Sequence, residues 1–233
     1  MQRKTRIRSF VHRNSRITPG QAQARSRLWP RFGLDWRAGL LDLNQVFNRQ
    51  APRFLEIGFG SGQSLALLAQ AHPEWDFIGV ETHRPGIGAL LLAVEQQGLT
   101  NVRVYEGDVI DVLSQSIPDH SLAGVQIFFP DPWPKRRHHV RRLIQVEFVQ
   151  LITQKLLAHG ILHLATDWQD YAMHMAEVLS QVPILSNLAA ATVFADDRST
   201  FRPLITKFER RAQREGRAVW ELQYRLDNIQ MLA

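Results

Sequence analysis

Five acidic side chains end or follow the apolar, strand-like segments of this sequence. They are Glu56, Glu81, Asp108, Asp131 and Asp167. In an open α/β sheet, ligands bind beyond the carboxyl ends of the strands, where these acids would gather. One such acid could be a turn or helix cap, but five at one edge are too many for capping alone. An edge lined with carboxylates suits a ligand that carries positive charge.

Asp131 is the most constrained of these acids, because Pro130 and Pro132 flank it. Proline fixes its own φ and restricts the residue before it, which predicts a stiff, extended backbone at Asp131. Taken alone, the stretch is equally compatible with a capping aspartate in a surface turn. Trp133 follows, and either packing against the sheet edge or stacking with an unstacked base would explain it.

A glycine loop follows the first acid, with Gly58, Gly60 and Gly62 after Glu56. Glycine lets backbone come close to a ligand at a strand–helix turn. The dinucleotide fingerprint Gly-x-Gly-x-x-Gly fails here at its third glycine, and a pyrophosphate would meet the carboxylate of Glu56. Glu81 stands where a carboxylate could bind ribose hydroxyls. A nucleoside with a cationic centre, such as S-adenosylmethionine, therefore fits this pattern better than NAD.

The elements that must position these residues alternate between strand and helix. Strands are predicted at 54–58, 77–81, 102–105, 123–129 and 161–166, with short β segments at 192–194 and 220–226. Helices are predicted at 64–71, 85–97 and 168–180. A further helix is predicted after the basic loop of residues 135–142; it presents Ile144, Phe148, Ile152 and Leu156 on one face and ends at Gly160. This alternation predicts a Rossmann-like α/β fold, with a mostly parallel seven-stranded sheet and helices on both faces.

The N-terminal segment differs from the rest in charge. Residues 1–34 contain nine Lys and Arg and no acid, and the 233-residue chain has a formal net charge of +6. We expect a basic arm with a short helix, from Thr18 towards Trp29, in residues 1–45, and a catalytic domain in residues 46–233. The arm would bind a phosphate backbone, although a solvated tail would have the same composition.

Composition excludes several classes of protein. The chain has no cysteine, which rules out disulfides, thiolate metal sites and cysteine nucleophiles. Its nine histidines lack metal-binding spacing, so we expect no metal. No apolar run approaches the ~20 residues that span a bilayer, and the basic N-terminus lacks the apolar core of a signal peptide. We therefore expect a cytoplasmic protein without membrane contact, either a monomer or a homodimer.

Three further motifs occur in order along the chain. They are Phe128-Phe129-Pro130-Asp131-Pro132-Trp133-x-Lys135, Ala165-Thr166-Asp167-Trp168 and Thr206-Lys207-Phe208-Glu209. With the glycine loop and the acids, they resemble the tRNA (guanine-N7)-methyltransferase family among class I S-adenosylmethionine-dependent enzymes. The resemblance covers Arg6 to Leu226 and implies methylation of N7 of the variable-loop guanine at tRNA position 46.

The resemblance also implies residue roles. Glu56 and the glycine loop would hold the methionine portion of the cofactor, Glu81 the ribose and Asp108 the adenine, while Asp131 would lie between cofactor and guanine as the catalytic residue. The substrate nucleotide would contact Lys135, Asp167, Thr206, Lys207, Phe208 and Glu209. The RNA backbone would contact Arg136, Arg137, Arg141 and Arg142, together with Arg6 and Arg8 of the arm.

Two alternatives stay open at this point. An enzyme that methylates the amino group of adenine would carry Asp/Asn-Pro-Pro-aromatic after its fourth strand, but here Trp133 follows Pro132 directly. A catalytically inactive RNA-binding protein with this fold would have no need for the complete set of acids. Guanine N7 already has a free lone pair, so Asp131 is expected to orient and stabilise charge and not to remove a proton.

Overall fold

The computed structural model describes residues 16–189, 193–195, 202 and 206–227, and within it an eight-stranded, mostly parallel sheet. The strands lie in the order β1-β4-β3-β2-β5-β6-β8-β7, and β8 runs antiparallel to both of its neighbours. Their bounds are β1 Gly33–Leu34, β2 Arg53–Ile57, β3 Asp76–Glu81, β4 Val102–Glu106, β5 Leu122–Phe128, β6 Leu156–Thr166, β7 Leu185–Asn187 and β8 Trp220–Leu226. The predicted fold class is confirmed; of the eight strands, the two-residue β1, which pairs with β4, and β7 were not predicted.

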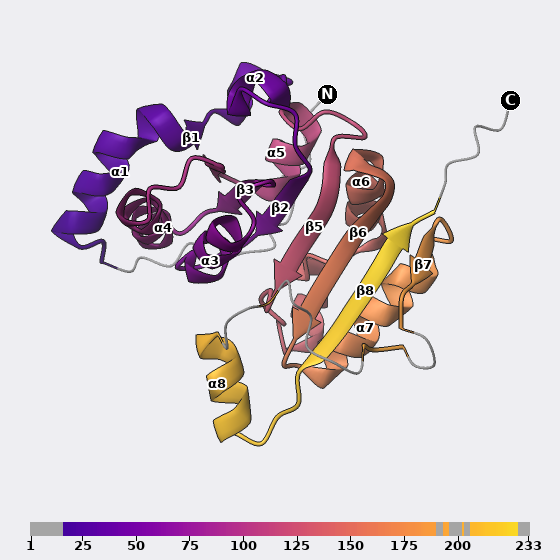
Figure 1. The fold of residues 1–233 in the computed structure, drawn as a ribbon. Coiled ribbons are helices and arrows are strands. Elements are labelled where there is room, and N and C mark those ends of the chain that lie inside the picture. The colour runs from indigo at the N-terminus through magenta and orange to yellow at the C-terminus, as the bar shows by residue number, and fades with distance from the viewer. Residues whose placement is uncertain (1–15, 190–192, 196–201, 203–205, 228–233) are drawn as a thin grey trace, which may run out of the picture.

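Helices cover both faces of the sheet (Figure 1). The bounds are α1 Pro19–Phe32, α2 Leu43–Phe47, α3 Gln63–Ala71, α4 Arg84–Gln96, α5 Val109–Gln115, α6 Val146–Lys155, α7 Gln169–Ser180 and α8 Lys207–Arg214, with 3₁₀ turns η1 Trp36–Ala38 and η2 Arg136–Arg141. Helices α1, α3 and α4 pack on one face, and α5, α6 and α7 pack on the other. Helix α8 stands apart from both layers, beyond the ends of β5 and β6 (Figure 1).

Helix α1 belongs to the packed body and is longer than predicted. The expected capping box is present, because the Thr18 hydroxyl accepts from the Gln21 N–H and the Gln21 side chain accepts from the Thr18 N–H. The helix continues past Trp29 because Ala24, Leu28 and Phe32, spaced four residues apart, bury one face against α4. The functional division between residues 45 and 46 stays a prediction, although α1 and β1 pack with the sheet.

Two predictions for the second half are wrong. The helix after the basic loop ends at Lys155, because Leu156 is extended and pairs with Leu122 as the first residue of β6. A short β segment at 192–194 is not formed: Val193 and Phe194 lie in a bend, and residue 192 is outside the described residues. The outer strand is β7, whose Leu185 is buried against the core.

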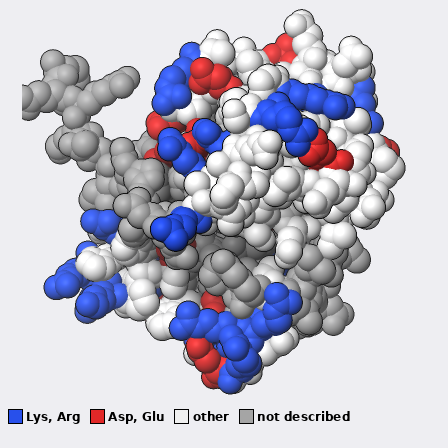
Figure 2. Space-filling model, turned by 90° about the vertical axis from the view of Figure 1, so that its left-hand side faces the viewer, with Lys and Arg blue, Asp and Glu red and all other residues white. Residues whose placement is uncertain are grey.

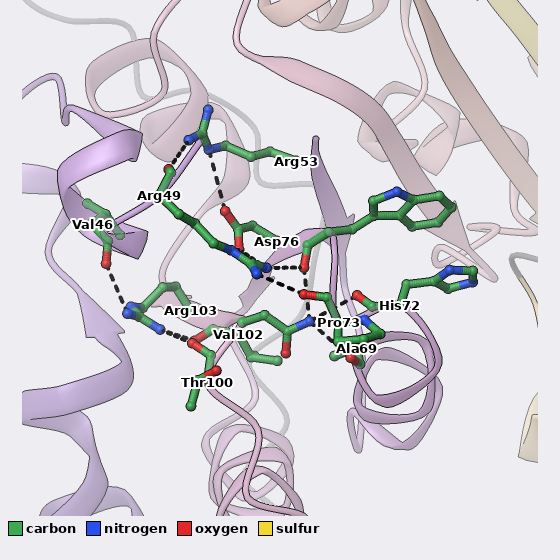
Figure 3. A network of polar contacts seen from close by, with 12 residues as sticks. Val46, Arg49, Arg53, Ala69, His72, Pro73, Asp76, Thr100, Val102 and Arg103 are labelled. Carbon is green, nitrogen blue, oxygen red and sulfur yellow. Dashed lines mark hydrogen bonds and ion pairs between the residues drawn. The ribbon is translucent and has the colours of Figure 1, made fainter. Parts of the chain in front are cut away.

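The amino ends of β2, β3 and β4 are tied by a polar network (Figure 3). Asp76 is fully buried, and its Oδ1 accepts from Arg49 Nε at 2.8 Å, while Arg53 lies 4.0 Å from its other oxygen. The buried Asn101 amide donates to three backbone carbonyls, which closes the turn before β3. The buried acid at this edge is thus neutralised by arginines, which marks it as structural.

Candidate active site

The acids predicted for the carboxyl edge of the sheet do lie there, because β2 to β6 all run parallel. Glu56 is the fourth residue of β2, and Glu81 ends β3. Asp108 is the N-cap of α5, and its carboxylate accepts from Ile110 N at 3.0 Å. Asp131 follows β5 and Asp167 follows β6. One edge of the sheet therefore carries all five.

Glu81 organises the glycine loop from the neighbouring strand. Its Oε2 accepts from Gly60 N at 2.9 Å, and its Oε1 accepts from the N–H groups of Thr82 and His83 at 2.7 and 3.0 Å. The loop glycines Gly58, Gly60 and Gly62 all have positive φ, between 60° and 74°, which a residue with Cβ rarely adopts. The loop thus exposes backbone beside a carboxylate instead of gathering N–H groups for a phosphate.

Glu56 is buried, and no described residue provides it with a counter-charge. It is 5% exposed, and its Oε2 has no hydrogen-bond partner among the described residues. Burial first, and then the nearby Glu81 carboxylate, raises the pKa of Glu56 to about 8. A bound cation would stabilise the ionised form of this carboxyl group. These residues therefore fit a cofactor with an ammonium and a sulfonium group.

Trp36 was missed by the sequence reasoning and lies beside the Asp108 turn. Its indole Nε1 is buried and has no hydrogen-bond partner within the described part of the chain. A Cβ placed on Gly107 would come within 2.7 Å of that nitrogen, so only glycine allows this approach. Trp36 lies between the predicted N-terminal helix and the first predicted strand, where no periodic pattern pointed to the sheet edge.

The Asp131 loop is held in an uncommon backbone conformation. Phe129 and Trp133 have φ of 54° and 46°, in the left-handed region that side chains with Cβ rarely adopt. The start of the loop is tied to the sheet, because Phe129 N donates to Ala165 O at 2.8 Å. Burial raises the pKa of Tyr171, and the Asp131 carboxylate adds to that rise, which places Asp131 within electrostatic reach of α7. Such strain persists only where neighbouring structure holds it.

The basic loop after Asp131 divides into exposed and buried arginines. Lys135, Arg136 and Arg137 are exposed, as an RNA-binding role requires. The Arg141 guanidinium lies 5.0 Å from the centre of the Trp133 ring, and His138 meets the same ring edge-on. Arg142, in contrast, is 3% exposed and bonded inside the protein. Both interpretations of Trp133, packing and base stacking, remain compatible with these contacts.

Two acids expected to bind substrate are paired with arginine. Asp167 Oδ2 lies 2.6 Å from Arg217 Nη2. Glu209 is buried and lies 2.9 Å from Arg202 Nη1, and it also completes a capping box with Thr206 at the start of α8. For Lys207 and Phe208 only the helical backbone is described, and Arg6 and Arg8 lie outside the described residues.

Arg202 connects α8 to the sheet, and nothing in the sequence pattern singled it out for this. It donates to Glu209 and, through Nε at 2.9 Å, to Glu221 of β8, and it lies 5.5 Å from the Phe129 ring centre. Glu221 also accepts from His163 Nε2 at 2.8 Å. Burial would raise the pKa of Glu221, but these hydrogen bonds outweigh it and lower that pKa to about 2.

Comparison with known proteins decides the family. A family model described as "Putative methyltransferase" matches residues 50–222. The tRNA (guanine-N(7)-)-methyltransferases of Alcanivorax borkumensis and Alkalilimnicola ehrlichii are each 54% identical to this chain. The alignments cover 93% and 95% of this chain, and 90% and 93% of the relatives. This chain belongs to the tRNA (guanine-N7)-methyltransferase family.

Solved structures support the fold of this family member. The 16S rRNA methyltransferase KamB superposes with a TM-score of 0.57 at 15% identity, over 80% of this chain and 93% of that chain. The aminoglycoside resistance methyltransferase NpmB1 superposes with a TM-score of 0.55 at 13% identity, over 83% and 94%. At this identity the likeness is one of fold, and it confirms the class I methyltransferase architecture.

Proposed function

We propose that this protein methylates N7 of a guanine in tRNA with S-adenosylmethionine as the methyl donor, and that the target is the variable-loop guanine at position 46. The observation that carries the proposal is the buried carboxyl group of Glu56, which no described residue neutralises, at one end of a site whose other end is basic. Membership of the family supports the reaction, and neither the adenine-directed nor the inactive alternative is favoured by these relatives.

The cofactor half of the site would bind and orient. When bound, S-adenosylmethionine supplies an electrophilic methyl group on a positively charged sulfur. Glu56 would face its cationic end, Glu81 its ribose, and the turn of Gly107 and Asp108 its adenine. Glu81 holds the glycine loop through the Gly60 hydrogen bond, so its carboxylate would serve both the loop and the ligand.

Asp131 would act on the guanine by position and charge. N7 is an acceptor with a free lone pair, so no proton has to leave before it attacks the methyl carbon. Alignment of the two reactants can supply on the order of 7–11 kcal/mol of the barrier. Positive charge then moves onto the purine, where the carboxylate of Asp131 would stabilise it. The stiff loop from Phe129 to Trp133 fits this role because a fixed carboxylate needs no reorganisation.

The RNA would lie across the basic surface next to the site. Lys135 to Arg137 are exposed beyond Asp131, and α8 adds the exposed Arg210, Arg211 and Arg214. Figure 2 shows basic side chains in several groups on one face, including a group at the level of α8. Asp167 and the segment from Thr206 to Glu209 would contact the target nucleotide, with their arginine partners adjusting to it.

No described helix is long and apolar enough to cross a membrane, and the described part of the chain contains no cluster of three or more possible metal ligands. The cytoplasmic location and the choice between monomer and homodimer stay predictions.

The direct test is methyl transfer from labelled cofactor to tRNA, with the product mapped by reduction and strand scission at N7-methylguanine. A tRNA whose variable-loop guanine is replaced by adenine is the matched substrate control and should accept no label. Label on adenine or on protein, or none with intact tRNA, would overturn the assignment.

The role of the basic arm has its own test. Removal of residues 1–16 is expected to weaken tRNA binding and to flatten its salt dependence, by ~0.7–0.9 in the logarithmic slope for each phosphate that the arm neutralises. Binding measured between low and moderate salt checks this. An unchanged slope would leave the arm as a passive tail.

A further inference from the structure

Arg142 does not behave like the other cations of the basic loop. Arg136 and Arg137 are exposed, whereas the Arg142 side chain is 1% exposed. A phosphate can approach an exposed guanidinium, but it cannot reach one that is enclosed by protein. Arg142 is therefore expected to have a different role from the exposed cations of the basic loop.

The contacts of Arg142 join three parts of the chain. Its Nε donates to the carbonyl oxygen of Pro132 at 3.0 Å. Its Nη2 donates to Asp170, in the first turn of α7, and lies 3.0 Å from His139 Nε2. The guanidinium also lies 4.9 Å from the centre of the Tyr171 ring. These partners occupy both the edge and the face of the group.

The carbonyl group that accepts a hydrogen bond from Arg142 belongs to Pro132, the residue directly after Asp131. Pro130 and Pro132 have no N–H, so the loop has few backbone donors with which to tie itself to the sheet. Trp133, directly after that carbonyl, has a φ of 46°. A strained conformation of this kind needs support from outside the loop. Arg142 provides such support, because it connects the Pro132 carbonyl to Asp170 on α7.

We propose that Arg142 is a positioning residue, which holds the carbonyl of Pro132 against α7 and thereby fixes Asp131 for methyl transfer, and that it does not bind RNA phosphate. The inference rests on the proposed function, because it assigns Arg142 a part in the same reaction. Its loss would misplace Asp131 and slow the methyl transfer step, while the exposed cations would still bind tRNA.

The test compares Arg142→Met with Arg137→Met, a matched change in the same loop. For Arg142→Met we expect the single-turnover rate to fall by on the order of 10²-fold, the cost of a small misplacement. Its Kd for tRNA and the salt slope of binding should stay at the wild-type values. For Arg137→Met we expect weaker binding and a slope lower by ~0.7–0.9, as when one phosphate is no longer neutralised.

Two milder variants keep the proposal testable if Arg142→Met does not fold. Arg142→Lys can reach Pro132 or Asp170 but cannot reproduce the planar fork, so it should recover part of the rate. Asp170→Asn removes the charged anchor on α7 and leaves Arg142 in place. It should lower the single-turnover rate less than Arg142→Met does, again without a change in the salt slope.

Several results would overturn the proposal. A salt slope that falls in Arg142→Met or Arg142→Lys as it does in Arg137→Met would make Arg142 a phosphate contact. Wild-type single-turnover rates in Arg142→Lys and Asp170→Asn would remove the positioning role. Failure of the proposed function itself would be seen separately, as wild-type protein that makes no N7-methylguanine in tRNA.

Discussion

Acids on the two sides of the site are neutralised in different ways. On the cofactor side, Glu81 accepts from N–H and hydroxyl donors, and Glu56 is buried with no counter-charge from the described residues. On the substrate side, Asp167 pairs with Arg217 and Glu209 pairs with Arg202. The two sides of the proposed site therefore differ in how the charge of their carboxylates is balanced, in accord with the ligand proposed for each side.

We propose that the difference follows from the charge of the two ligands. A cationic cofactor would supply the positive charge that Glu56 lacks, so that carboxyl group would need no arginine. RNA is a polyanion, and bare carboxylates beside it would repel it. On the proposed substrate side the arginine partners cancel the charge of Asp167, which is partly exposed, and of Glu209, which is buried. In this proposal the same residue type would serve two ligands of opposite sign.

The largest expected effect comes from breaking the buried pairs of Arg202. Arg202→Met leaves Glu209 and Glu221 buried without this cation, which typically costs about 3–5 kcal/mol. The free energy of unfolding in urea measures this. Arg211→Met is the control, because it removes an exposed pair with Glu215 and should leave the unfolding midpoint close to that of wild type. Equal unfolding midpoints for the two variants would show that the substrate-side pairs do not support the fold.

Asp131→Asn tests the acid that lies between the two sides. The amide keeps the size of the side chain but loses its charge, so we expect a single-turnover rate lower by about 10²–10³-fold, the usual loss for one transition-state contact. Binding of tRNA should change much less. Normal turnover in this variant would remove Asp131 from the centre of the mechanism.

Glu56→Gln tests the cofactor side through pH. The folded pKa of Glu56 is raised to about 8 from 4.5, so the folded state binds more protons between these values. Stability contributed by this group is therefore present below pH 4.5 and is lost as pH rises through about 8, by at most about 1.4 kcal/mol per pH unit. Urea unfolding of ligand-free wild type should show this loss, and Glu56→Gln should not.

Cofactor binding should have the opposite dependence on pH. A cation is bound best when Glu56 is ionised, so the affinity for S-adenosylmethionine should rise from about pH 6 to about pH 8 more steeply in wild type than in Glu56→Gln. Calorimetric titration of both proteins checks this, and the variant corrects for titration of the cofactor's own amino group. Identical profiles would show that Glu56 does not face the cation.

Arg217→Met should have a smaller effect on stability than Arg202→Met. Its pair with Asp167 is partly exposed, with side chains 27% and 17% accessible, so solvent already screens much of the attraction. The uncovered carboxylate should nevertheless raise the KM for tRNA. A double variant with Asp167→Asn should return the KM towards wild type. An unchanged KM in Arg217→Met would mean that arginine pairing on this side has no bearing on RNA.

Local pattern was enough to predict the fold class and the place of the acids. Alternating strands and helices predict a parallel sheet, and parallel strands bring Glu56, Glu81 and Asp167 to one edge whatever the details of packing. The glycine loop and the capping box at Thr18 could also be predicted from the sequence, since both depend on residues a few positions apart. The motif resemblance placed the chain in the family that the relatives confirm.

Only the tertiary structure determined which charged side chains are exposed to a ligand and which are paired inside the protein. Arg137 and Arg142 stand in the same basic run, yet one is exposed and the other is buried against Asp170, 28 residues away. Arg202 meets Glu221 across 19 residues, where no local spacing predicts a pair. Strand pairing of Leu156 with Leu122 set the end of α6, and burial against α4 set the length of α1. The residue type determines which interactions a side chain can make. Long-range contacts determine whether its partner in those interactions is a ligand or another part of the protein.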